Sequence, residues 1–158
     1  MNAYPVTDAV TYVGADDPDL ALFEGQHPVR PIGVSYNSYV ITDQKIAVMD
    51  TVDARATDAW LENLDFALDG RTPDYLIISH MEPDHAANIA RLAALYPEMK
   101  LVGNAKTFVM LRQFFGPDAA PDQRLVTVGE GDVLELGSHR LRFFLAPMVH
   151  WPEVMVTY

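Results

Sequence analysis

The chain has 158 residues, 49% of them hydrophobic and 21% charged, which is typical of one globular domain and excludes wholesale disorder. Its net charge of -11 argues against nucleic acid and anionic membrane surfaces as partners, because both require basic patches. The sequence contains no cysteine, so any metal must be bound by histidine, carboxylate or water.

The sequence has no run that approaches the roughly 18 consecutive apolar residues of a membrane span. Its N-terminus, Met1-Asn2-Ala3-Tyr4-Pro5, lacks the basic region and apolar stretch of a secretory signal. We therefore expect a cytoplasmic protein without a membrane segment, in which residues 1–158 belong to one domain.

The first third of the chain predicts strands around a long loop. Loose alternation over Asp8–Val13 indicates a first strand. Prolines and a glycine interrupt Ala15–Pro31, which predicts a loop. The runs Ser38–Thr42 and Lys45–Met49 predict a hairpin. The acidic residues of the long loop are expected to form a solvated face: Asp16, Asp17, Asp19 and Glu24.

Helices and strands interleave in the rest of the chain. Thr57–Leu68 carries an apolar stripe at helical spacing, with Thr57 as a plausible cap and Gly70 as a stop. Tyr75–Ile78 predicts a strand buried on both faces. The remaining expected elements are helices over Ala86–Leu95 and Ala105–Phe115 and strands over Leu101–Val102, Arg124–Val128, Val133–Leu136, Leu141–Leu145 and Val154–Tyr158. The pattern predicts a mixed α/β (α+β) class, with Met148 and Met155 in the core.

Potential metal ligands crowd the stretch that follows Tyr75–Ile78, namely His80, Glu82, Asp84 and His85. In an extended segment the first three point the same way and His85 points elsewhere, which favours two metal positions. Imidazole and carboxylate donors suit iron, zinc or manganese. A solvated turn with Asp84 as an N-cap is the alternative, but the strand–loop–helix context favours metal.

His150 lies between an apolar strand and Trp151-Pro152, and together with the His80 stretch it is favoured as a further ligand. Trp151 either lines the same pocket or packs in the core. Five candidate ligands are too few to fill two metal sites without sharing and additions. Residues 1–158 alone are therefore expected to bind metal weakly and to be inactive.

The stretch His80-Met81-Glu82-Pro83-Asp84-His85 matches H-x-[EH]-x-D-H, which resembles the signature of the metallo-β-lactamase superfamily. Hydrolases of that superfamily usually have histidine at the third position. The variant with Glu82 resembles the flavodiiron proteins (A-type flavoproteins), which reduce dioxygen to water or nitric oxide to nitrous oxide. The segments Ser35–Tyr39, Val48–Asp53 and Ala146–Glu153 resemble the same family, so the likeness runs from about Val6 to Tyr158.

The resemblance implies a metallo-β-lactamase-like αββα sandwich, of which residues 1–158 would be the N-terminal half, incomplete at the C-terminus. It implies one iron on His80, Glu82 and His150 and a second iron on Asp84 and His85. A bridging carboxylate, one more histidine and the flavodoxin-like domain that carries FMN would come later in the family's chain. The family also implies a head-to-tail homodimer and a rubredoxin or flavin reductase type electron donor.

Two more residues gain an alternative role from the resemblance. His27 is either a surface loop histidine or a neighbour of the ligands or substrate pocket. Asp50 either supports the metal loop or forms a turn. Two other functions stay open: a dinuclear-zinc hydrolase of the same superfamily, which Glu82 counts against, and a truncated non-catalytic domain that acts in assembly or regulation.

Overall fold

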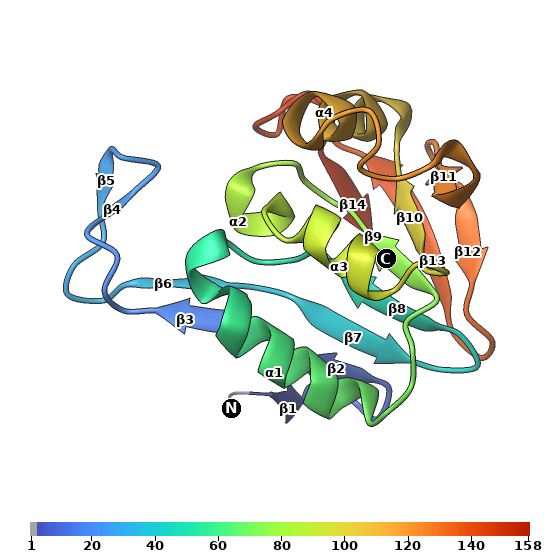
Figure 1. Ribbon diagram of the computed structural model, residues 1–158, viewed down its shortest axis with the longest axis horizontal. Coiled ribbons are helices and arrows are strands. Elements are labelled where there is room, and N and C mark those ends of the chain that lie inside the picture. Colours follow the sequence, from blue (N-terminus) through green and yellow to red (C-terminus); the bar gives the residue numbers. More distant parts are fainter. Residues whose placement is uncertain (1–2) are drawn as a thin grey trace.

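A seven-stranded sheet forms the middle of the computed structural model, which describes residues 3–158 (Figure 1). Met1 and Asn2 lie outside the described residues. They belong to the N-terminal stretch from which we expected no secretory signal. The strands are, in spatial order, β1 (Tyr4–Pro5), β2 (Val10–Tyr12), β7 (Tyr39–Thr42), β8 (Ile46–Met49), β9 (Tyr75–Ile77), β10 (Lys100–Gly103) and β11 (Leu125–Thr127). Pairing is antiparallel from β1 to β8 and parallel from β8 to β11.

A second, three-stranded antiparallel sheet packs against one face of the first. It contains β12 (Val133–Glu135), β13 (Arg140–Leu145) and β14 (Met155–Thr157). Fully buried side chains from both sheets meet between them, among them Ile77, Val102 and Phe143. Met155 belongs to this core as predicted, whereas the prediction for Met148 was wrong because it lies exposed on the loop before β14.

Helices cover the other face of the seven-stranded sheet (Figure 1). They are α1 (Thr57–Leu68), α2 (Pro83–Ala86), α3 (Ile89–Leu95) and α4 (Ala105–Phe115), with short 3-10 turns η1 (Ala54–Ala56) and η2 (Asp122–Arg124). Their apolar stripes meet the sheet in the larger core, where Trp60 and Leu92 are fully buried. The helix–sheet–sheet layering confirms the predicted mixed α/β class. Within the described residues, no helix is long and apolar enough to cross a membrane.

The bounds of α1 and α4 agree with the sequence pattern. Thr57 is not the cap of α1, however, because Ala56 takes that position. The hydroxyl of Thr57 instead donates to the carbonyl of Ala54. Asn104 caps α4 by accepting from the backbone N–H groups of Lys106 and Thr107.

The helix expected over Ala86–Leu95 is divided in two and begins earlier. Proline is accommodated in the first turn of a helix, so α2 starts at Pro83 and takes in Asp84 and His85. The buried amide of Asn88 separates α2 from α3 and donates to the carbonyl of Val52. The sequence analysis assumed that Asp84 continues the extended segment of His80 and Glu82. That assumption was wrong, because Asp84 lies in the first turn of α2.

The expected loop over Ala15–Pro31 contains strands. β3 (Ala15–Asp17) pairs with β6 (Val34–Tyr36), and β4 (Leu22–Phe23) pairs with β5 (His27–Pro28). Together they form an arm that extends beyond the sheet, with the β4–β5 hairpin at its end (Figure 1).

Asp17 anchors this arm, so its assignment to a solvated loop face was wrong. Its carboxylate is almost fully buried and accepts from Arg55 Nε at 2.6 Å and from the Tyr36 hydroxyl at 3.0 Å. Arg55 lies 38 residues further along the chain, which left no local signal for the pair. The hydrogen bond from Arg55, aided by that from Tyr36, outweighs burial and lowers the pKa of Asp17 below its ordinary value of 3.8.

Asp17→Asn is expected to lower the thermal stability of the arm at pH 7, and this difference should shrink as the pH falls below about 4. A carboxyl group whose pKa is lower in the folded chain stabilises the fold above its unfolded pKa. That contribution disappears as the pH falls through the folded pKa. Thermal unfolding from pH 7 to pH 2.5 measures the difference, with Asp19→Asn on the exposed part of the arm as the matched control. A constant difference across this range would contradict the role of the charge.

Candidate metal centre

The carboxyl ends of the parallel strands β8, β9 and β10 share one edge of the sheet, where ligand sites of open α/β sheets usually lie. Asp50 directly follows β8, Asn104 directly follows β10, and His80 is the third residue after β9. Pro83 favours an extended conformation in the residue before it, and Glu82 has φ -64° and ψ 145°. The loop thus presents His80 and Glu82 from an extended backbone and Asp84 and His85 from the first turn of α2.

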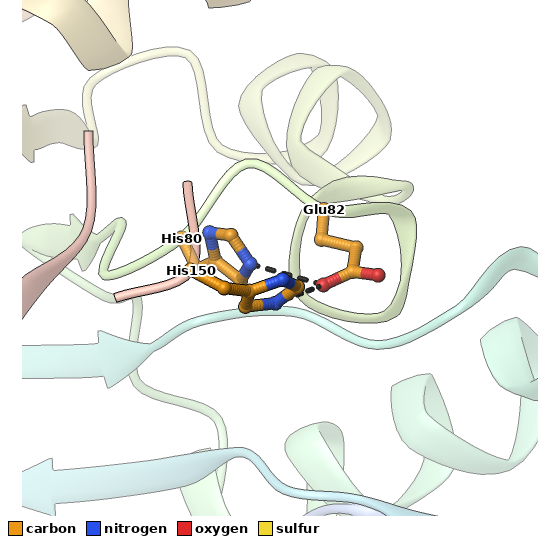
Figure 2. A group of neighbouring side chains, drawn as sticks. All are labelled: His80, Glu82 and His150. Carbon is orange, nitrogen blue, oxygen red and sulfur yellow. Dashed lines mark hydrogen bonds and ion pairs between the residues drawn. The ribbon is translucent and has the colours of Figure 1, made fainter. Parts of the chain in front are cut away.

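Three predicted ligands converge on one point. Nε2 of His80 and Nε2 of His150 each lie 3.0 Å from the same oxygen of Glu82 (Figure 2). One ligand atom from each of the three residues fits within 4.8 Å of the others. His80 and Glu82 are 8% exposed, and the imidazole of His150 reaches them from the exposed loop before β14. His80, Glu82 and Asp84 were predicted to converge with His150, and the structure brings His80 and Glu82, but not Asp84, into this group.

Asp84 and His85 form a neighbouring pair instead of joining that group. Nε2 of His85 lies 3.6 Å from Oδ2 of Asp84, and the rings of His80 and His85 are 5.4 Å apart. Oδ1 of Asp84 is buried and has no hydrogen-bond partner among the described residues. The five predicted ligands thus form two adjacent donor groups.

A carboxylate contacts Nδ1 of each of the two histidines of the loop. Asp50 lies with Oδ2 3.1 Å from Nδ1 of His85, and its Oδ1 accepts from the backbone N–H of Ser79. Between the two alternatives for Asp50, these contacts favour support of the metal loop. Glu153 makes the corresponding contact with Nδ1 of His80 at 2.8 Å. The sequence reasoning missed Glu153, although an acidic residue within the apolar run Trp151–Val156 was a usable signal.

An open cleft of about 600 Å³ lies before the donor groups, lined on one side by the β4–β5 hairpin and on the other by Glu82, His150 and Trp151. The indole of Trp151 meets the ring of His80 edge to face at 5.2 Å, so it lines the site. His27 is exposed on β5 and lies 3.5 Å from Glu24, with no recorded contact to the predicted ligands among the described residues.

Glu24 is exposed, as the solvated face predicted for it requires, and it also lines the cleft from the hairpin. It shares a hydrogen bond with Glu82, which lowers the pKa of Glu24. Burial, followed by this bond and the charge of Asp84, raises the pKa of Glu82. Burial alone would lower the pKa of His85, but the hydrogen bond and charge of Asp50 raise it. Neighbouring carboxylates thus contribute to the raised pKa of both Glu82 and His85, and such a concentration of negative charge favours a bound cation.

The donor set fits a metal ion. Imidazole nitrogens and carboxylate oxygens converge without thiolate, which suits iron, zinc or manganese. The unpartnered Oδ1 of Asp84 at a buried position is what a missing cation would leave behind. The carboxylates behind Nδ1 of His80 and His85 leave Nε2 of each ring directed at the donor groups.

Layering of helices, a mixed sheet and a second sheet, with a histidine–carboxylate loop at the carboxyl edge of the parallel strands, defines a metallo-β-lactamase-like domain. The chain belongs to the ODP family of beta lactamases, whose family model matches residues 34–158.

Relatives of the chain are named as flavodiiron proteins, which confirms the resemblance. This chain is 32% identical over 158 residues to the flavo-diiron protein FprA2 of Clostridium acetobutylicum, and the match covers 99% of this chain and 38% of that protein. It is also 32% identical over 154 residues to the anaerobic nitric oxide reductase flavorubredoxin of Aliivibrio salmonicida, covering 97% of this chain and 30% of that protein. The chain therefore spans only 30% to 38% of the length of these relatives.

Solved structures agree with the fold. The flavodiiron protein from Giardia intestinalis superimposes with a TM-score of 0.90 at 26% identity, covering 100% of this chain and 37% of that one. The rubredoxin oxygen:oxidoreductase from Desulfovibrio gigas gives a TM-score of 0.90 at 29% identity, covering 99% and 38%.

Proposed function

We propose that this chain is the metal-binding module of a flavodiiron oxidoreductase that reduces dioxygen to water, nitric oxide to nitrous oxide, or both. The observation that carries the proposal is the carboxylate of Glu82 between two imidazoles, at the position where hydrolases of the superfamily usually have histidine. An anionic oxygen donor favours a hard, redox-active iron over zinc. The names of the flavodiiron and flavorubredoxin relatives support the same class.

In this proposal His80, Glu82 and His150 hold one iron, and Asp84 and His85 hold the other. Bound iron supplies the electron transfer to dioxygen or nitric oxide, with FMN as its electron source. The protein's part is to fix ligand geometry and to limit water at the site. Asp50 and Glu153 orient the two loop histidines, and Trp151 shields His80 on one side.

The proposal extends to parts that lie outside residues 1–158. A bridging carboxylate, a further histidine and the FMN domain come from the rest of the polypeptide. In the proposed head-to-tail homodimer, FMN carried by one subunit would supply electrons to the metal site of the other. The proposed electron donor is of the rubredoxin or flavin reductase type. The names of the Desulfovibrio gigas protein and of the flavorubredoxins support rubredoxin chemistry for those proteins.

The complete protein that contains this chain tests the proposal. After loading with ferrous iron under argon, we expect two irons per chain by elemental analysis. We also expect consumption of dioxygen or nitric oxide when a reduced flavin donor is supplied. The zinc-loaded protein is the matched control and should consume neither gas. Zinc retention together with hydrolysis of an ester, thioester or amide substrate would instead establish the dinuclear-zinc hydrolase.

A further inference from the structure

Glu153 is the most deeply buried acidic side chain beside the candidate metal centre. It lies in the loop between β13 and β14, and its side chain has 0% exposure. One oxygen, Oε1, lies 2.8 Å from Nδ1 of His80 and 2.8 Å from the backbone nitrogen of Met81. A single carboxylate oxygen therefore contacts both a predicted metal ligand and the backbone of the loop that carries it.

We propose that Glu153 is a positioning residue for His80, which fixes the imidazole with its proton on Nδ1 and its free electron pair on Nε2. The assignment follows from the neighbouring bond, because the N–H of Met81 can only donate and Oε1 therefore acts as an acceptor. Nδ1 of His80 must then be the donor to Oε1. The opposite nitrogen faces Glu82, where a cation would be bound. This inference rests on the metal-binding part of the proposed function.

The same arrangement occurs a second time in the site. Asp50 contacts Nδ1 of His85 with one oxygen and accepts from the backbone N–H of Ser79 with the other. Both carboxylates thus join an imidazole to the backbone at the end of β9. The ring of His80 is 9% exposed and that of His85 is 31% exposed, so Glu153 acts on the histidine that is more shielded from water.

The surroundings of Glu153 also indicate that its charge matters. Its second oxygen, Oε2, is buried without a hydrogen-bond partner among the described residues. Within residues 3–158, His80 is its single ion-pair partner. A buried carboxylate is costly unless positive charge compensates it. A cation held by Nε2 of His80 supplies that charge through the ring, and the carboxylate in return makes the imidazole a stronger donor.

Glu153 has a structural contact as well, which the test must separate from its effect on His80. Its backbone carbonyl accepts from Nδ2 of Asn104 at 2.6 Å, and the next strand begins with a bond from Met155 N to the carbonyl of Ser79. These bonds use the main-chain carbonyl of Glu153 and the main-chain nitrogen of Met155. Substitution of the Glu153 side chain leaves those main-chain atoms in place, so changes at the metal report on the carboxylate.

The test compares Glu153→Gln and Glu153→Ala in the complete protein, using cobalt(II) and iron(II) as probes. Affinity is measured by competition with a chelator, ligand geometry by the visible spectrum of bound cobalt, and folding by thermal unfolding without metal. Glu130→Gln is the matched control, because the carboxylate of Glu130 also accepts a bond from a backbone N–H, that of Leu145. Unlike Glu153, Glu130 is exposed, and it contacts no histidine within residues 3–158.

We expect Glu153→Ala to weaken metal binding by about 10- to 100-fold and to change the cobalt spectrum. Glutamine keeps an acceptor oxygen for both N–H groups, so Glu153→Gln should retain the spectrum while binding more weakly than the unaltered protein. Unchanged affinity and spectrum in Glu153→Ala would overturn the proposal. If Glu153→Ala does not fold, unchanged affinity in Glu153→Gln would overturn it.

Failure of the two proposals can be told apart. An unaltered protein that binds neither metal refutes the proposed function and this inference together. A protein that binds metal in a Glu153-dependent way but reduces neither gas refutes only the reductase activity.

Discussion

Replacement of Glu82 with alanine is expected to abolish tight metal binding in the complete protein, and with it any reduction of dioxygen or nitric oxide. Both imidazoles of the main donor group converge on one oxygen of this side chain, so its loss leaves two neutral donors and a hole between them. The loss of affinity should exceed the roughly 10- to 100-fold caused by removing an outer hydrogen-bond partner of a ligand. Elemental analysis after dialysis against a chelator measures the effect.

Two further variants sharpen this experiment. Glu62→Ala removes an exposed carboxylate on α1 and should retain metal, which controls for the change in net charge. Glu82→His should shift preference from iron towards zinc and lower reductase activity, because imidazole suits zinc and removes an anionic donor. Unchanged iron content together with unchanged gas consumption in Glu82→His would refute the role assigned to the carboxylate.

Trp60→Ala should be the most destabilising single change in the core. The indole is 0% exposed between α1 and the sheet, and its Nε1–H donates to the hydroxyl of Ser38 at 3.1 Å. Truncation of a buried tryptophan costs about 3–5 kcal/mol of unfolding free energy. For a domain of this size, that lowers the melting temperature by on the order of 10 °C.

Calorimetry of the complete protein measures this shift in the melting temperature of the domain that contains residues 1–158. Trp60→Phe is the control, since it keeps most of the buried surface and loses mainly the hydrogen bond, worth about 1 kcal/mol. The Ser38 hydroxyl also donates to the backbone carbonyl of Asp50, so Ser38 connects Trp60 to a residue that contacts His85. Equal melting temperatures for Trp60→Ala and Trp60→Phe would contradict the packing argument.

Local patterns were sufficient to predict much of the fold. The apolar stripe of Trp60, Leu64 and Leu68 predicted α1 with its bounds, and the run at Tyr75 predicted the strand that leads into the metal loop. These features depend on neighbours three or four residues away, or on continuous burial, both of which are visible in a single sequence.

The errors arose where distant residues decide the structure. Asp17 looked solvated because its partner Arg55 lies on another element, and β3 depends on pairing with β6 across the whole arm. Asn88 divides the expected helix because its amide bonds to the carbonyl of Val52. Glu153 stood out as an acidic residue within an apolar run, but its pairing with His80 was missed because 73 residues separate the two.

The candidate metal centre, like the fold, was predicted only in part. The dense spacing after a buried strand predicted a metal loop with four candidate ligands, His80, Glu82, Asp84 and His85. The division into two donor groups follows from the helix start at Pro83, which turns Asp84 away from the extended segment. The sequence analysis expected this helix to begin at Ala86 and did not recognise Pro83 as its first residue.

The separation of 73 residues between His80 and Glu153 also bears on the order of folding. During synthesis the loop that carries His80, Glu82, Asp84 and His85 leaves the ribosome well before β13 and β14. Until those last strands dock, His150 and Glu153 cannot reach the loop, and long-range closures of this kind form late. On the proposed function, a nascent chain would therefore offer an incomplete, exposed set of ligands with little selectivity among metals. Selection of the correct metal would have to wait for the second sheet, and the bound metal would in turn stabilise the docking of that sheet.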